Sequence, residues 1–397
     1  MTKAPLLSII LIGYNSKPFL KHCLDGVMKQ TFKNIETIFI DNESHDDSIE
    51  FVKKNYPKVK VVANKINSGY VGAANQGIKL SHAKYLMILN PDLILSPTYL
   101  KHALARMEKD KKIGVLTGKV LKYDFEKDHP TKQIDTTGLY CYRNRRIIDR
   151  GQGLMDEGQY DKPEEVFGVS GAIPIYRREA LEDTKLPTFL KGKSKHLINC
   201  PEGTPAVALA WSSRINGEQG HEGVGEASRW NEPSPVPMDS CIECAYEYLD
   251  EDFFMYKEDI DLSWRLRLRG WKCFYESTAL AHHGRGTGVL KRFSHWEVYK
   301  GRKNLSRFAK FYAYKNQRLM QIKNEQWPNI WRDFSPLLTK EILIFGYILV
   351  REPHLFKAIF KFLAQLPHAL KKRRLIQHRA KISPQKMRKW INGSARP

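Results

Sequence analysis

Four short apolar runs, separated by helix-length segments, constrain the fold of this chain more than any other feature of its sequence. The runs are residues 6–12, 35–40, 59–63 and 85–89. Unbroken stretches of Ile, Val and Leu are typical of strands that are buried on both faces of a parallel sheet. Residues 18–30, between the first two runs, carry apolar side chains at helical spacing. The alternation predicts an α/β fold in which helices flank a Rossmann-like nucleotide-binding sheet.

The expected strands end in residues that suit a nucleotide and a metal ion. Ligands of parallel sheets bind beyond the carboxyl ends of the strands. The residues at these ends are Tyr14, Asn15, Asp41, Asn42, Asn67, Gly69 and Asp92. Carboxylates accept hydrogen bonds from ribose hydroxyls and bind hard cations, although Asp and Asn also form turns and helix caps. Asp41 and Asp92 favour a binding site, because both end apolar strands at the same edge of one sheet.

Two other nucleotide-binding classes fit the sequence less well. The Gly-rich segment 68–72 lacks the G-x-G-x-x-G pattern and follows the third run instead of the first, which argues against a dinucleotide-binding dehydrogenase. A sugar nucleotidyltransferase would carry a Gly- and Arg-rich loop after its first strand, where this chain has Gly-Tyr-Asn-Ser at 13–16.

The positive charge of the chain is concentrated in its last quarter. The net charge is +22, and residues 291–397 contain 25 Lys and Arg against 5 Asp and Glu. An anionic partner is therefore expected to bind this C-terminal region. A pI near 9.6 leaves a nucleic-acid-binding protein as an alternative, but that class does not explain the acidic residues at the strand ends.

The C-terminal region has the pattern of a membrane-surface helix. Residues 354–370 carry large apolar side chains at helical spacing, and the basic run 371–374 follows at once. Such a helix lies in the plane of an anionic membrane surface, whereas residues 337–350 are expected to pack their apolar face on the rest of the protein. The six cysteines are typical of reduced thiols, so we expect a cytoplasmic protein, peripheral on the inner face of the cell membrane.

Seven segments, in order across residues 6–290, resemble the inverting glycosyltransferase family 2, which has the type A nucleotide-sugar fold, and in particular its rhamnosyltransferase-like branch. The segments are SIILIGYNS, TFKNIETIFIDNESHDDS, NKINSGYVGAANQGI, YLMILNPDL, VSGAIPIYRREAL, DEDFFMYKEDIDLSWRLRLRGW and ALAHHGRGTG. The resemblance implies transfer of a hexosyl or deoxyhexosyl unit, with rhamnose as one candidate, from a nucleoside-diphosphate sugar to a glycan or lipid-linked acceptor in cell-surface polysaccharide biosynthesis.

The resemblance also implies roles for the matching residues. The nucleotide-sugar contacts would be Tyr14, Asn15, Asp41, Asn42, Asn67, Gly69, Asn90 and Arg285. Mg2+ or Mn2+ would bind Asp92, which stands in the place of the family's Asp-x-Asp motif, and His282. Asn90 replaces the first Asp of that motif and so removes one charge.

The acidic residues at the start of a predicted helix supply the catalytic candidates. An inverting transfer needs one carboxylate to take the proton of the acceptor hydroxyl while the metal stabilises the leaving diphosphate. The resemblance assigns this base to Asp259, with Glu258 and Asp261 as supports. Asp259 and Asp261 fall on different faces of the helix, so they cannot serve one point equally. An acidic first turn is also favoured by the helix dipole alone.

The region between the family's segments departs from its pattern. We expect a nucleotide-sugar-binding half over 1–115, an acceptor half over 116–290, and a disordered insertion at about 186–246 because its composition shifts to Gly, Pro and Ser. A zinc site is an alternative for residues in this insertion, but one C-x-x-C pair with irregular partners is a weak signal. Its candidates are His196, Cys200, His221, Cys241 and Cys244. The insertion and Asn90 also keep open a catalytically inactive scaffold.

Overall fold

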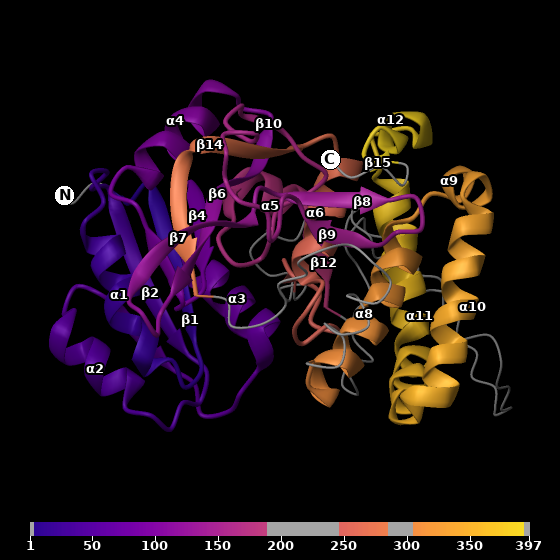
Figure 1. The fold of residues 1–397 in the computed structure, drawn as a ribbon, viewed down its shortest axis with the longest axis horizontal. Helices are drawn as coiled ribbons and strands as arrows, with labels where there is room; N and C mark the ends of the chain where they lie inside the picture. The colour runs from indigo at the N-terminus through magenta and orange to yellow at the C-terminus, as the bar shows by residue number, and fades with distance from the viewer. Residues whose placement is uncertain (1–3, 189–245, 285–304, 393–397) are drawn as a thin grey trace, which may run out of the picture. The chain divides into compact units, whose positions relative to one another are not determined.

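The computed structural model describes residues 4–188, 246–284 and 305–392 (Figure 1). Residues Met1–Leu186 and Glu247–Pro397 form one compact unit, which contains every described helix and strand except one residue of each of two short strands, Pro187 and Tyr246. The predicted insertion and its zinc candidates lie outside the described residues, apart from 186–188 and 246. The predicted start of the C-terminal region, residue 291, also lies outside them.

The described residues form a mixed α/β structure around a ten-stranded sheet, so the predicted fold class is confirmed. The strands run in the order β10-β14-β6-β11-β4-β1-β2-β3, with β5 on β14 and β7 on β6. Their bounds are β1 Leu7–Gly13, β2 Ile35–Asp41, β3 Lys60–Ala63, β4 Tyr85–Leu89, β5 Leu93–Leu95, β6 Ile113–Asp124, β7 His129–Thr136, β10 Glu164–Glu165, β11 Ile175–Arg177 and β14 Lys272–His283. Strands β3, β2, β1 and β4 are mutually parallel, as the four apolar runs predict.

Helices cover both faces of the sheet. The helices are α1 Lys17–Met28, α2 Ser48–Asn55, α3 Gly69–Leu80, α4 Tyr99–Lys109, α5 Arg178–Thr184 and α6 Glu258–Leu268. Side chains of β1 alternate between two core clusters: Ile9 and Leu11 join the cluster of α1 and α4, whereas Ile10 and Ile12 join that of α3, α5 and α6. All seven residues of β1 are buried, because the strand lies between two layers of helices.

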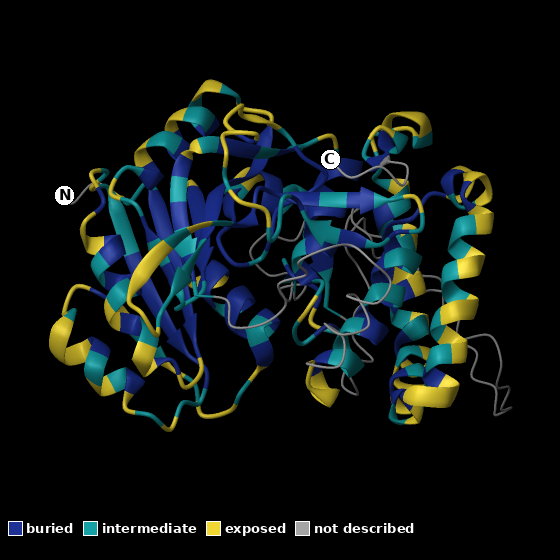
Figure 2. Ribbon diagram, viewed as in Figure 1, coloured by how far each residue is buried: buried dark blue, intermediate teal, exposed yellow. Residues whose placement is uncertain are grey.

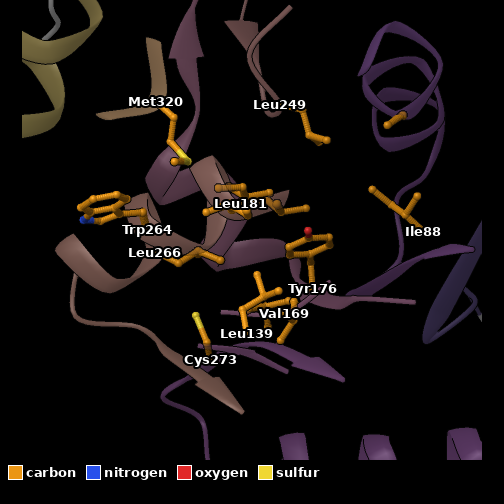
Figure 3. Packing of buried hydrophobic residues seen from close by; sticks show 14 of the residues in the cluster. Ile88, Leu139, Val169, Tyr176, Leu181, Leu249, Trp264, Leu266, Cys273 and Met320 are labelled. Atoms are coloured by element: carbon orange, nitrogen blue, oxygen red, sulfur yellow. The ribbon is translucent and has the colours of Figure 1, made fainter. Parts of the chain in front are cut away.

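The C-terminal region is helical, as predicted, and shares the core of the sheet. Its elements are α8 Arg307–Asn324, α9 Trp327–Arg332, α10 Phe334–Arg351, a 3-10 turn Pro353–Leu355, α11 Phe356–His378 and α12 Pro384–Arg388. Figure 3 shows Met320 of α8 beside Trp264 and Leu266 of α6 and Leu181 of α5, all in one cluster. Strand β15 (Ile391–Asn392) pairs with β8 (Leu139–Tyr142), which also pairs with β9 (Ile147–Asp149). The short strands β12 (Leu186–Pro187) and β13 (Tyr246–Glu247) complete the described elements.

Two helices of this region differ from the expectation. The prediction that residues 337–350 pack their apolar face on the protein is wrong, because α10 leaves most of that face exposed (Figure 2). The predicted apolar face of residues 354–370 is divided: Leu355, in the 3-10 turn, is buried, whereas Phe360 and Leu363 of α11 are exposed. No helix among the described residues is both long enough and apolar enough to pass through a bilayer.

Candidate active site

The carboxyl ends of β1 and β2 are joined by side chains that the sequence predicts to bind nucleotide. Asn15, in the left-handed region with φ 49°, accepts from the backbone N–H of His45 through Oδ1 at 2.8 Å. Asp41 Oδ2 accepts from the Ser44 N–H at 3.0 Å, and its buried Oδ1 has no partner among the described residues. Tyr14 is 52% exposed. One open aromatic ring and one unpaired carboxylate oxygen are thus available at this edge.

Asn42 fixes the loop that leads into α3. Its Nδ2 donates to Asn67 Oδ1 at 2.9 Å and to the Gly69 carbonyl at 3.1 Å, while its Oδ1 accepts from the Ser68 N–H at 3.1 Å. Gly69 has φ +75°, and an added Cβ would lie 2.5 Å from the Phe254 ring. Asn42 is therefore a bracing residue whose hydrogen bonds hold Asn67 and Gly69 at the strand ends.

Asp92 lies against a histidine at the end of β14. His283 Nε2 is 3.2 Å from Asp92 Oδ1, and its Nδ1 is 2.8 Å from Asp135 Oδ2 on β7. Burial alone would lower the pKa of His283, but the two carboxylates raise it to about 9. Because Asp135 fixes one ring nitrogen, the other is held toward Asp92.

The structure places His283, and not the predicted His282, beside Asp92. Alternate residues of a strand point to opposite faces of a sheet, and Ala279, Ala281 and His283 are buried on the same face of β14. His282 belongs to the other face, with its ring centroid 6.4 Å from that of Tyr123, and burial lowers its pKa. Arg285 lies outside the described residues.

One loop, residues 171–172, connects Asn90 with Asp259. The Asn90 N–H donates to the Ala172 carbonyl at 3.1 Å, and the Gly171 N–H donates to Asp259 Oδ2 at 2.8 Å. Tyr70 Oη donates to the Gly171 carbonyl at 2.6 Å. The structure thus brings Asp259, at the start of α6, close to the end of β4 that carries Asn90 and Asp92.

The three acids of α6 have different surroundings. Burial, with Asp259 next, raises the pKa of Glu258 to about 8, and Glu258 Oε2 has no partner among the described residues. Burial also raises the pKa of Asp259, although the Gly171 N–H opposes the shift. Asp261 instead accepts from Arg265 Nε at 3.0 Å and lies 2.9 Å from Lys323 Nζ. Asp261 therefore joins α6 to α8 and faces away from Asp259.

The segment just before Asp259 has a strained backbone that α8 holds in place. Phe254, Tyr256 and Lys257 all have positive φ, between 66° and 73°, a region that costs a non-glycine residue of the order of 1 kcal/mol or more. Asn316 of α8 donates through Nδ2 to the carbonyls of Phe253, Met255 and Tyr256 at 2.8–3.0 Å. We call residues 253–257 the catalytic loop, because they lead directly into Glu258 and Asp259.

Buried lysines of the C-terminal helices neutralise the acidic segment that precedes this loop. Lys372 of α11 lies 2.7 Å from Glu247, 2.5 Å from Asp250 and 3.0 Å from Asp252. Lys323 of α8 pairs with Asp250 as well. Both lysine side chains are at most 3% exposed. Part of the basic charge of the C-terminal region is therefore neutralised inside the protein.

Comparison with known proteins identifies the N-terminal part of the unit. Residues 8–185 match the family model described as Glycosyl transferase family 2. Residues 8–185 of this chain are thus similar to glycosyltransferase family 2 domains. Within the described residues, no group of three or more His, Cys, Asp or Glu side chains is placed to hold a metal ion.

Individual relatives are distant. An uncharacterized glycosyltransferase of Haemophilus influenzae is 28% identical over 131 residues, 32% of this chain and 40% of the relative. The UDP-Glc:alpha-D-GlcNAc-diphosphoundecaprenol beta-1,3-glucosyltransferase WfaP of Escherichia coli is 28% identical over 121 residues, 30% of this chain and 48% of the relative. The chain thus spans less than half the length of these two proteins. A crystal structure of GalNAc-T7 with UDP, GalNAc and Mn2+ is 13% identical, with a TM-score of 0.48, and covers 80% of this chain and 48% of that one.

The sequence reasoning missed the residues that act through others. Asp135 of β7 and Asn316 of α8 lie outside the seven family segments. Tyr70 of α3 and Gly171 lie within two of these segments, but the sequence assigned them no role. His283 had a signal: it shares strand parity with the small apolar Ala279 and Ala281. The inward-facing histidine could therefore have been chosen from alternation alone.

Proposed function

We propose that the protein is an inverting, metal-dependent glycosyltransferase. It transfers a hexosyl or deoxyhexosyl unit, with rhamnose as the sugar that the sequence resemblance suggests, from a nucleoside-diphosphate donor. The observation that carries the proposal is the position of one carboxylate, Asp259, next to the strand end that bears Asn90 and Asp92.

The donor binds, in this proposal, at the carboxyl ends of β1 and β2. Asp41 Oδ1 is free to accept a hydrogen bond from a nucleoside group. Tyr14 offers an exposed ring for the base. Asn15, Asn42, Asn67 and Gly69 shape the loops around these two residues, as their hydrogen bonds indicate.

Asp92, just before β5, and His283, at the end of β14, fit a divalent cation. Two neighbouring ligands of an octahedral ion with bonds of about 2.1 Å lie about 3 Å apart, and Asp92 Oδ1 and His283 Nε2 are 3.2 Å apart. The other ring nitrogen of a metal-bound histidine usually donates a hydrogen bond to a carboxylate, a carbonyl or water. For His283 this partner is the Asp135 carboxylate. We therefore assign Asp92 and His283 to Mg2+ or Mn2+, with His283 in the place first given to His282. A bound cation would neutralise the charge of the diphosphate leaving group.

Asp259 acts as the general base in this proposal. A neutral Glu258 beside it lets Asp259 carry the negative charge, since two adjacent buried carboxylates do not ionise together, and the raised pKa of Glu258 keeps its proton at neutral pH. Asp259 can then accept the proton of the acceptor hydroxyl as the oxygen attacks the anomeric carbon and the nucleoside diphosphate leaves from the opposite side.

The test of the base is a pair of neighbouring amide substitutions. Asp259→Asn should lower kcat on the order of 100-fold or more, with donor binding nearly unchanged. Glu258→Gln replaces the protonated, uncharged Glu258 with an uncharged amide. Its kcat should stay within a few fold of the wild-type value at pH 7. Purified protein would be assayed with nucleotide sugars and Mn2+. Equal rates for the wild type and Asp259→Asn, or no turnover of any nucleotide sugar, would contradict the proposal, the latter favouring an inactive scaffold.

The test of the metal site compares two adjacent histidines. Asp92→Ala and His283→Ala should weaken binding of nucleoside diphosphates only when Mn2+ is present, and His282→Ala should not. Isothermal titration with UDP and GDP, with Mn2+ and with a chelator, measures the difference. Equal losses in both conditions would indicate a structural role for Asp92 and His283.

The acceptor in this proposal is a glycan or a lipid-linked sugar of cell-surface polysaccharide synthesis. The relative WfaP is named for an acceptor on a diphosphoundecaprenol carrier, which supports a lipid-linked acceptor here. We accordingly propose a cytoplasmic protein that binds the anionic inner face of the cell membrane through its C-terminal region. Nucleic acid is a poorer partner, because it gives no reason for the apolar surface of that region.

A further inference from the structure

Helix α10 turns its apolar side to solvent. Seven large apolar side chains of this helix are between 45% and 73% exposed. They are Phe334, Leu338, Ile342, Leu343, Phe345, Leu349 and Val350. The other exposed residues of 334–350 are Ser335, Thr339 and Gly346, so no charged residue is among the exposed residues of this stretch. A surface helix normally has the opposite polarity.

Two charged residues of α10, Lys340 and Glu341, lie on its inner side instead, and only Arg351, the last residue of the helix, is exposed. Glu341 pairs with Arg318 of α8 and lies 3.2 Å from Lys340. Ile348, fully buried, packs with Tyr314 and Leu355 in a small core cluster. The orientation of α10 is therefore fixed by contacts on its inner side, and its apolar outer side is a stable property of the fold.

The helix before α10 extends the apolar surface with two indole rings. Trp327 and Trp331 of α9 are 61% and 70% exposed, and the Trp331 ring stacks on Phe334 at 6.0 Å. We call Trp327, Trp331 and the seven apolar side chains of α10 the outer face. Contiguous apolar surfaces of this kind mark interaction sites, and Trp is enriched at the boundary between a membrane and water.

All exposed charged residues in the segment around the outer face have one sign. Within 327–363 they are Arg332, Arg351, Lys357 and Lys361, whereas Asp333 and Glu352 are buried. A symmetric dimer through this face would bring like charges together, since both copies present the same surface. An anionic lipid surface complements an apolar face bordered by basic residues.

We propose that the outer face binds the interface of an anionic lipid bilayer. Helix α10, about 27 Å long at the usual helical rise, lies in the membrane plane with Ile342 and Leu349 among the acyl chains. This inference deepens the proposed membrane association and rests on it. It moves the main contact from the predicted segment 354–370 to α9 and α10.

The experiment compares two double variants in vesicle sedimentation. Full-length protein is mixed with vesicles of phosphatidylcholine alone, or of phosphatidylcholine with phosphatidylglycerol. Ile342→Glu with Leu349→Glu places two acids on the outer face. Leu80→Glu with Met155→Glu makes the same kind of change at exposed apolar residues elsewhere. Thermal unfolding with UDP and Mn2+ checks that each variant is folded and tests nucleotide binding separately.

The expected result is that the wild type and the control sediment with the anionic vesicles and the outer-face variant binds at least tenfold more weakly. Tryptophan fluorescence of the wild type should shift to shorter wavelength with the same vesicles. Equal sedimentation of all three proteins, or none for the wild type, overturns the inference. So does a wild-type dimer, by light scattering, that only the outer-face variant dissociates. If the protein binds vesicles but no nucleoside diphosphate stabilises it, the transferase proposal is contradicted. The proposal that the outer face binds a bilayer is not.

Discussion

The inner helices of the C-terminal region, α8 and α11, and its outer helix, α10, use charge and apolar surface in opposite ways. Helix α11 buries Lys372 among three carboxylates, whereas α10 exposes Ile342 and Leu343. A buried lysine and a large exposed apolar patch are both unusual. Each is explained by its surroundings, because Lys372 neutralises the acidic segment beside the catalytic loop and the outer face has a partner in our proposal.

The difference shows that the amount of charge in a segment does not tell where the charge acts. Lys371 to Arg374 form one basic run in the sequence, yet Lys372 is buried, and Arg373 donates to the Glu325 carbonyl at 2.7 Å. The inner helices therefore hold the shape of the catalytic loop, on which the proposed chemistry depends. The outer helix is free to serve another surface.

The largest expected effect on the free energy of unfolding comes from removing the positive charge of the buried Lys372. Lys372→Met leaves Glu247 and Asp252 without their shared cation, and breaking a buried ion pair in this way costs about 3–5 kcal/mol. Lys357→Met, on the exposed side of the same helix, should change the free energy of unfolding by no more than about 0.5 kcal/mol. Urea denaturation of the two variants measures both. Similar losses would remove the distinction between buried and exposed lysines of α11.

Asn316 tests whether α8 shapes the catalytic loop. Asn316→Ala leaves three carbonyls of the loop without their donor and should destabilise the protein by about 1–3 kcal/mol. We expect kcat to fall while UDP still binds in the presence of Mn2+. The proposed nucleotide-binding residues lie at the ends of β1 and β2, outside the catalytic loop. Thr339→Ala, at an exposed position of α10, is the matched control substitution. A merely structural Asn316 would lower stability without separating kcat from nucleotide binding.

Low pH should weaken the ion pairs of the inner helices, and the outer face should not change this loss of stability. Burial would raise the pKa of Asp250, but Lys323 and Lys372 hold it well below its ordinary value. Such a group stabilises the fold at pH values above its unfolded pKa, and this stability is lost as pH falls below about 4. The free energy of unfolding of the wild type should therefore drop in acid more steeply than that of Lys372→Met. The Ile342→Glu, Leu349→Glu variant retains Lys372 and should keep the wild-type drop. Parallel curves for the wild type and Lys372→Met would contradict this account.

The smallest expected effect is a single polar substitution on the outer face. Leu343→Ser removes a side chain that is 64% exposed, so the free energy of unfolding should stay within about 0.5 kcal/mol of the wild type. Ile348→Ser, on the inner side of the same helix, opens a cavity and should cost about 2–5 kcal/mol. Thermal and urea unfolding compare the pair. A large loss for Leu343→Ser would show that the outer face is covered within the protein itself.

The sequence by itself determined the parallel sheet and the position of its strand-end residues. Runs such as 6–12 and 85–89 bury both faces, and this requirement is local enough to be visible in the chain. The separation of Asp259 from Asp261 followed in the same way from helical periodicity. Both features depend on residues that are close in sequence.

Only the tertiary structure decided which side chains complete the site and which surfaces stay open. Asp135 reaches His283 across 148 positions of sequence, and Asn316 reaches the catalytic loop across about sixty. No local pattern encodes such pairs, because they depend on how β7 and α8 pack. The exposure of α10 was hidden for the same reason: an apolar stripe shows that a helix has a side to cover, and the packing of its neighbours decides which side that is.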